Sequence, residues 1–125
     1  MTTNPGGRSG AEREKVLELS PIADPRLAEV VTRLVEAYHP DRIYLFGSRA
    51  RGDAGHDSDY DLLLVVPDDA ASDRSRSRLA YEDLWDTGTA ADVLVVKRGL
   101  FESRLHLPAS LPATVIREGK LLHAA

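Results

Sequence analysis

The chain has 125 residues, a formal net charge of -4 and no cysteine. This length predicts one domain with a modest core, and the lack of cysteine excludes disulfides and thiolate metal sites. The mildly acidic balance argues against direct nucleic-acid binding, which usually needs a basic surface stripe. The sequence has neither an apolar run near the ~20 residues of a membrane span nor a signal-peptide core, so we expect a cytoplasmic protein without a membrane partner.

The N-terminal residues predict a tail followed by a helix. Residues 1–20 begin with a polar stretch rich in glycine, so we expect a disordered tail, with the domain spanning residues 21–125. Asp24 before Pro25 is the pattern of a helix N-cap followed by a first-turn proline. The helix is predicted to end near His39. Its apolar face holds Leu27, Val30, Val31, Leu34, Val35 and Tyr38.

Two apolar strands enclose a polar, glycine-rich loop. The first strand is predicted over residues 42–46 and ends at Gly47 and Ser48. The second strand opens with Asp59 and Asp61, and five consecutive apolar residues follow. Because a continuous apolar run is typical of a strand buried on both faces, we expect the two carboxylates at the mouth of a buried element.

The two aspartates predict a metal site. Side chains alternate along a strand, so Asp59 and Asp61 project to one face, while Tyr60 projects to the other and is expected in the core. Carboxylates this close repel each other unless a cation neutralises them, and a hard divalent ion with oxygen ligands is the usual partner. An isolated DxD pair is more often a solvated turn, but the preceding Gly47 and Ser48 favour a metal site here.

The loop between the strands predicts a phosphate-binding turn. Gly47 lets an anion approach the backbone N–H groups, and Ser48 can cap a short helical turn and donate its hydroxyl to a phosphate oxygen. Arg49 and Arg51 add guanidinium groups suited to phosphate oxygens. Ser58 is a further candidate for a phosphate contact, beside its expected role in shaping the loop.

The C-terminal half of the chain supplies the remaining elements. Asp92 stands at the start of a predicted third strand, where it can point into the same mouth as the first two aspartates. The predicted elements are a helix over residues 73–86 with Tyr81, Leu84 and Trp85 inward, a strand over 91–96, a weak helix over 101–107, a helix over 112–118 that stops at Gly119, and an edge strand over 120–123.

Gly47 and Ser48, followed after ten residues by the DYD of residues 59–61, resemble the GSx10DxD signature of the nucleotidyltransferase superfamily that includes DNA polymerase β. The chain length and the order of elements are similar to those of its minimal nucleotidyltransferase (MNT) members, over roughly residues 24–123. The resemblance implies an α/β (α+β) fold with a small mixed sheet of three to four strands and helices packed on one side. Asp92 matches the third aspartate of that pattern.

The resemblance also implies an activity. Asp59, Asp61 and Asp92 would be the catalytic carboxylates and the ligands of two Mg²⁺ ions, with ATP as the substrate. The nucleotide-binding residues that it implies are Gly47, Ser48, Arg49, Arg51 and Ser58. AMP would pass to a protein hydroxyl, a tyrosine of a cognate HEPN-family toxin, so that the chain acts as an antitoxin and can form an oligomer alone or with the toxin. No residue by itself selects adenine.

Other functions stay open at this point. The chain could neutralise a toxin by binding alone, or could adenylylate a small hydroxyl compound such as an aminoglycoside. Two pairs, Arg51 with His56 and Arg33 with His39, fit the loose RxxxxH spacing of HEPN ribonucleases. The first pair lies in a glycine-rich loop and the second straddles a predicted helix end, so ribonuclease activity is disfavoured.

Overall fold

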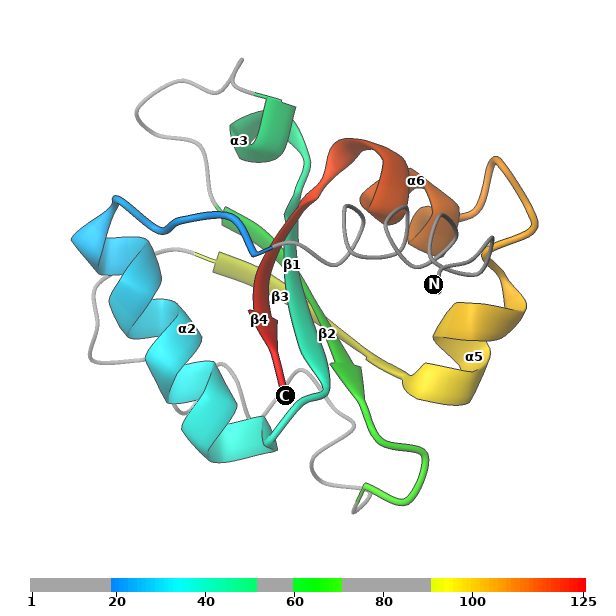
Figure 1. Ribbon diagram of the computed structural model, residues 1–125, viewed down its shortest axis with the longest axis horizontal. Coiled ribbons are helices and arrows are strands. Elements are labelled where there is room, and N and C mark those ends of the chain that lie inside the picture. Colours follow the sequence, from blue (N-terminus) through cyan, green and yellow to red (C-terminus); the bar gives the residue numbers. More distant parts are fainter. Residues whose placement is uncertain (1–18, 52–59, 71–90) are drawn as a thin grey trace, which may run out of the picture.

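Figure 1 shows the computed structural model of the chain, which describes residues 19–51, 60–70 and 91–125. The elements in chain order are α2 (Pro25–Tyr38), β1 (Arg42–Phe46), α3 (Ser48–Arg51), β2 (Tyr60–Val66), β3 (Ala91–Lys97), α5 (Arg98–Ser103), α6 (Leu111–Glu118) and β4 (Lys120–Ala124). The predicted helix over residues 73–86 lies outside the described residues, as do residues 1–18 of the predicted tail. Among the described helices, none has the length and apolar character needed to cross a bilayer.

The strands form one mixed sheet in the order β3-β2-β1-β4. β1 is antiparallel to β2 and β4, whereas β2 and β3 are parallel. The predicted small mixed sheet is thereby confirmed, including the C-terminal edge strand. Beyond β4, Leu19 forms a parallel bridge with Leu121, and the N–H of Ser20 donates to the Leu121 carbonyl at 2.7 Å.

Helix α2 covers one face of the sheet. It begins as predicted, because the Asp24 carboxylate accepts the N–H of Arg26 at 2.9 Å and Pro25 occupies the first turn. It ends at His39, which has a left-handed backbone (φ 49°) and whose N–H donates the last helical hydrogen bond, to the Val35 carbonyl. Buried side chains of this helix and of β2 belong to one core cluster. They are Leu27, Val30, Val31, Leu34 and Tyr38 from α2, and Tyr60, Leu62, Leu64 and Val66 from β2.

Helices α5 and α6 cover the opposite face. Phe101 and Val115 reach down from these helices onto Tyr44, Leu63 and Val65. The expectation of helices on one side was therefore wrong, as Figure 1 shows with α2 on one side of the sheet and α5 and α6 on the other. The physical reason is β2, whose apolar side chains alternate between the two faces, so that both faces need cover.

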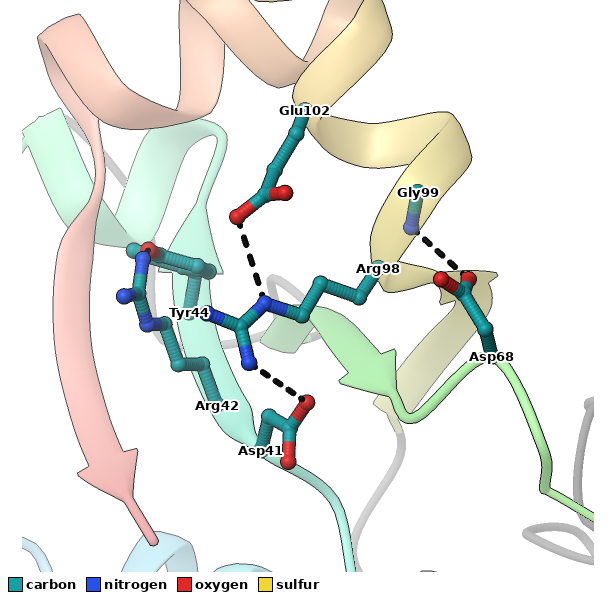
Figure 2. A network of polar contacts seen from close by, with 7 residues as sticks. All are labelled: Asp41, Arg42, Tyr44, Asp68, Arg98, Gly99 and Glu102. Carbon is teal, nitrogen blue, oxygen red and sulfur yellow. Dashed lines mark hydrogen bonds and ion pairs between the residues drawn. The ribbon is translucent and has the colours of Figure 1, made fainter.

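Helix α5 also begins earlier than the predicted weak helix over residues 101–107, directly after β3. Lys97 at its N-cap position makes no side-chain cap bond. Instead, Asp68 in the segment after β2 accepts the N–H of Gly99 at 2.8 Å, as Figure 2 shows. Because this cap comes from a distant part of the chain, the local sequence did not indicate where the helix starts.

Arg98 adds charge pairs at the same end of the sheet (Figure 2). Its guanidinium lies 3.2 Å from the Glu102 carboxylate and 3.7 Å from that of Asp41. The hydrogen bond to Glu102, and then the charges of Glu102 and Asp41, raise the pKa of Arg98. Since Arg98 and Glu102 are both more than half exposed, these pairs contribute little to stability. Of the two pairs, only the one with Asp41 links α5 to another part of the chain.

The packing of α5 against the sheet can be tested at two neighbouring residues of that helix. Phe101 is 1% exposed and Leu100 is 51% exposed. We expect Phe101→Ala to lower the free energy of unfolding by about 3–5 kcal/mol, because the truncation leaves a cavity between α5 and the sheet. The control Leu100→Ala should change it by no more than about 0.5 kcal/mol. Urea unfolding followed by circular dichroism measures both, and equal losses would contradict this packing.

Candidate active site

The candidate site begins at Gly47, where β1 ends. Gly47 has a left-handed backbone with φ of 75°, which residues with a side chain rarely adopt. Phe46 and Asp61 are register partners in β1 and β2, and the Asp61 carboxylate lies so close to Gly47 that a Cβ there would overlap it. A glycine is therefore required both for backbone conformation and for space. The close approach places the Asp61 carboxylate beside the turn that the sequence predicts to bind phosphate.

The turn continues into the short helix α3, of which Ser48 is the first residue and Arg51 the last. The N–H of Ala50 donates to the Gly47 carbonyl at 3.1 Å. Ala50 is buried and belongs to the core on the α2 side of the sheet. Gly47, Ser48 and Arg49 thus follow one another in a single anchored turn at the end of β1, as Figure 1 shows for α3.

Two of the predicted carboxylates are neighbours in the sheet. Asp61 in β2 is the register partner of Asp92 in the parallel strand β3. Paired residues of neighbouring strands project to the same face, and such strands lie about 4.8 Å apart. Asp61 is half-buried and Asp92 is exposed. The fold therefore brings two carboxylates with different access to solvent onto one face of the sheet. Side-chain alternation along β2 makes this the same face that α5 and α6 cover beyond Asp61.

The other predicted ligand and one predicted phosphate contact lie outside the described residues. β2 begins at Tyr60, so Asp59 and Ser58 directly precede its described part, and their roles stay predictions. Within residues 19–51, 60–70 and 91–125, no group of three or more His, Cys, Asp or Glu could hold a metal ion.

Tyr60 joins three elements on the opposite face of β2. Its side chain is 6% exposed, and its hydroxyl donates to the carboxylate of Asp24, the N-cap of α2. The Arg49 guanidinium carbon of α3 lies 4.3 Å from the centroid of the Tyr60 ring. A cation over an aromatic face at this distance is attracted by the ring quadrupole. Tyr60 thus contacts both the start of α2 and the predicted phosphate turn.

These contacts shift the pKa of both partners of the Asp24–Tyr60 pair. The hydrogen bond from Tyr60 lowers the pKa of the Asp24 carboxyl below its ordinary value of 3.8. Burial, and then the bond to Asp24, raise the pKa of the Tyr60 phenol above its ordinary value of 10.0. Across the neutral pH range, Asp24 therefore stays a charged acceptor and Tyr60 a neutral donor.

The sequence placed Tyr60 in the core, which is confirmed, but did not link it to Asp24 or Arg49. Asp24 was explained fully by its role as a helix cap, and the two bonded residues are 36 positions apart in the chain. Only the packing of α2 on the sheet brings them together. The structure also places the second RxxxxH pair. Arg33 forms an ion pair with Glu29 at 3.4 Å, and His39 follows the end of α2.

The space beside Gly47 generates a prediction. Gly47→Ala should lower the free energy of unfolding by more than about 1 kcal/mol, because its φ is positive and the new Cβ would displace the Asp61 carboxylate. The control Gly99→Ala should stay within about 1 kcal/mol of the wild type, because the nearest atoms to its Cβ, at 3.1 Å, belong to the Asp68 carboxylate. Urea unfolding of the two variants compares them, and a neutral Gly47→Ala would disprove the close approach.

The lowered pKa of Asp24 predicts a pH dependence of stability. A carboxyl with a depressed folded-state pKa contributes stability above its unfolded pKa, which is lost as the pH falls through the folded value. Wild type should therefore be more stable than Asp24→Asn at neutral pH, and the difference should shrink as the pH falls below 3.8. Calorimetric melting at several pH values measures this, and a difference that grows towards acid pH would have the wrong sign.

Comparison with known proteins agrees with this fold. The nucleotidyltransferase domain family model matches residues 26–121. A protein from Sulfolobus solfataricus described as a candidate nucleotidyltransferase has 18% identity and a TM-score of 0.54, with 99% of this chain and 92% of that chain covered. A toxin–antitoxin structure with AMP-PNP has 25% identity and a TM-score of 0.51, with 78% of this chain and 73% of that chain covered. No curated protein matches significantly. Because the family model covers most of the chain, including β1, β2 and β3 with Gly47, Asp61 and Asp92, the chain belongs to the nucleotidyltransferase domain family.

Proposed function

We propose that this chain transfers AMP from ATP to a protein hydroxyl, a tyrosine of a cognate HEPN-family toxin, and thereby acts as the antitoxin. The observation that carries the proposal is the register pairing of Asp61 with Asp92 beside Gly47. This arrangement gathers two carboxylates and a glycine turn at one end of the sheet. Carboxylates that hold metal ions next to a phosphate-binding turn are what phosphoryl and nucleotidyl transfer require.

The residues present fit Mg²⁺. Carboxylate oxygens are the ligands that this hard cation prefers, and both described carboxylates are reachable, since Asp92 is exposed and Asp61 is only half-buried. Asp59, one position before Tyr60, is the proposed third ligand. When bound, two Mg²⁺ ions would neutralise phosphate charge and lower the pKa of the acceptor hydroxyl.

The triphosphate would lie against the turn at the end of β1. Gly47 and Ser48 supply its backbone, and Arg49 supplies a guanidinium suited to phosphate oxygens. Arg51 and Ser58 are proposed as further phosphate contacts. The nearness of Gly47 to Asp61 supports this placement, because the phosphates and the carboxylates must be close enough to share the same cations.

The transfer is an in-line displacement at the α-phosphate. The acceptor oxygen forms a bond to the α-phosphorus, and the bond from that phosphorus to the oxygen bridging to the β-phosphate breaks. Pyrophosphate leaves with the electron pair, and the product is an AMP ester of the acceptor. Asp92 would accept the hydroxyl proton. Its exposed side chain supports this role, because a hydroxyl of another protein has to reach the base from solvent.

The choice of acceptor rests on different support. The toxin–antitoxin structure with AMP-PNP, at 25% identity, supports a toxin partner and a nucleotide substrate for this chain. The HEPN class of the toxin and its tyrosine come from the resemblance of the sequence to MNT proteins. The acceptor is therefore a separate claim from nucleotidyl transfer.

The test uses the chain with its cognate partner, ATP and Mg²⁺, and intact-protein mass spectrometry of the partner. We expect wild type to add one AMP-sized mass to the partner. Asp61→Asn and Asp92→Asn should each reduce the initial rate by at least about 100-fold, since loss of groups that only support metal ligands already costs 10–100-fold. Addition of a chelator should abolish the reaction.

The matched control is Asp69→Asn. Asp69 is exposed and follows the end of β2, whereas Asp61 lies at the start of that strand. This variant should keep the wild-type rate. Tight binding of the partner without any mass addition would reject transfer and leave neutralisation by contact. Labelling that persists in an Asp61→Asn, Asp92→Asn double variant would reject these residues as the catalytic pair.

A further inference from the structure

The start of β2 carries a set of contacts that the transfer reaction does not itself use. Tyr60 connects Asp24 of the α2 N-cap to Arg49 of α3, through a hydroxyl–carboxylate hydrogen bond on one side and a ring–guanidinium contact at 4.3 Å on the other. These contacts form a polar route from α2 to the predicted phosphate turn, beside the apolar packing of Ala50 in the core on the α2 side. It runs entirely on the face of the sheet opposite to Asp61.

The route starts from a rigid point. Asp24 is held twice, because one carboxylate oxygen accepts the N–H of Arg26 at 2.9 Å and the other accepts the Tyr60 hydroxyl. Helix α2 itself is fixed by five buried side chains. At the other end, α3 has only four residues, of which Ala50 reaches the core. A helix this short has little stability of its own, so its orientation depends on tertiary contacts.

Consecutive residues of β2 therefore contact the turn from both faces of the strand. Tyr60 packs under Arg49 on the α2 face, and Asp61 packs against Gly47 on the other face. Because neighbouring side chains of a strand point in opposite directions, these two contacts lie on opposite faces of the start of β2. The Gly47–Arg49 turn is thus held between two adjacent side chains.

We propose that Tyr60 is a positioning residue for nucleotide binding, acting through Arg49. Its ring and its bond to Asp24 hold the guanidinium and the Gly47 turn in the orientation that receives the triphosphate. The inference rests on the proposed function. A guanidinium over an aromatic ring is attracted by the ring face, whereas phosphate oxygens bind to its N–H groups. The contact with the Tyr60 ring is thus compatible with phosphate binding by Arg49.

The test measures the Kd of Mg²⁺ with α,β-methylene-ATP by calorimetry, since the methylene group prevents cleavage of the bond that transfer breaks. Tyr60→Phe keeps the ring and loses the hydrogen bond to Asp24, so Kd should rise about threefold to tenfold. Tyr60→Leu loses both contacts and should raise Kd by about tenfold or more. The matched control is Tyr44→Phe, which removes another buried tyrosine hydroxyl, one that accepts from Arg42 on the opposite face. It should leave Kd within about twofold.

A double-mutant cycle separates positioning from a general structural role. If Tyr60 acts through Arg49, Tyr60→Leu should change Kd by less than about threefold in an Arg49→Gln background. Full additivity of the two substitutions would overturn the inference. Thermal melting of each variant establishes that it is folded, and Tyr60→Phe carries the test if Tyr60→Leu does not fold.

The outcomes also distinguish this inference from the proposed function. If wild type binds the analogue and the Tyr60 variants bind it equally well, the positioning role is wrong and nucleotidyl transfer stands. If wild type binds no analogue in the presence of Mg²⁺, the proposed function is wrong and the positioning role falls with it.

Discussion

Burial of β2 on both faces is the constraint on which the rest of the structure depends. Of its seven residues, Asp61 alone is not buried. A slip of one position against β1 or β3 would move Asp61 into the α2 core and bring apolar side chains to the other face, at a large cost. Core packing therefore fixes the register, and the register places Asp61 between Phe46 and Asp92. The candidate site takes its geometry from apolar residues that do not belong to it.

Two aspartates that bind helix N-termini hold the helices to opposite ends of this strand. Asp24 caps α2 and accepts the hydroxyl of Tyr60, the first residue of β2. Asp68, just after the end of β2, accepts the N–H of Gly99 in α5. Each of the two carboxylates also accepts a helix N–H that lacks a partner within its own helix, that of Arg26 for Asp24 and that of Gly99 for Asp68. The helix on each face is thus fixed to the strand by a polar contact as well as by its apolar side chains.

The unequal exposure of the two described carboxylates suits a division of roles in a nucleotidyltransferase. Asp61 lies between strands and against the backbone of Gly47, where its position is set by its surroundings. Asp92 lies on β3, at one end of the strand order, and is exposed, so a second molecule can approach it. In the proposed reaction, Asp61 would lie next to the nucleotide and Asp92 next to the acceptor, an order that suits group transfer between two molecules.

The sequence alone determined the local elements and the chemistry at the level of the family. The helix from Asp24, the strand before Gly47, the third strand with Asp92 and the C-terminal edge strand all follow from capping, periodicity and turn chemistry, which act over a few residues. Tertiary structure decided the rest. Helix α5 lies opposite α2 and begins where Asp68 accepts the Gly99 N–H. The Asp61 carboxylate lies against Gly47, and Tyr60 contacts both Asp24 and Arg49. All of these contacts join residues that are distant in the chain. Such contacts leave no periodic pattern, because they arise only when packed elements bring separate segments together.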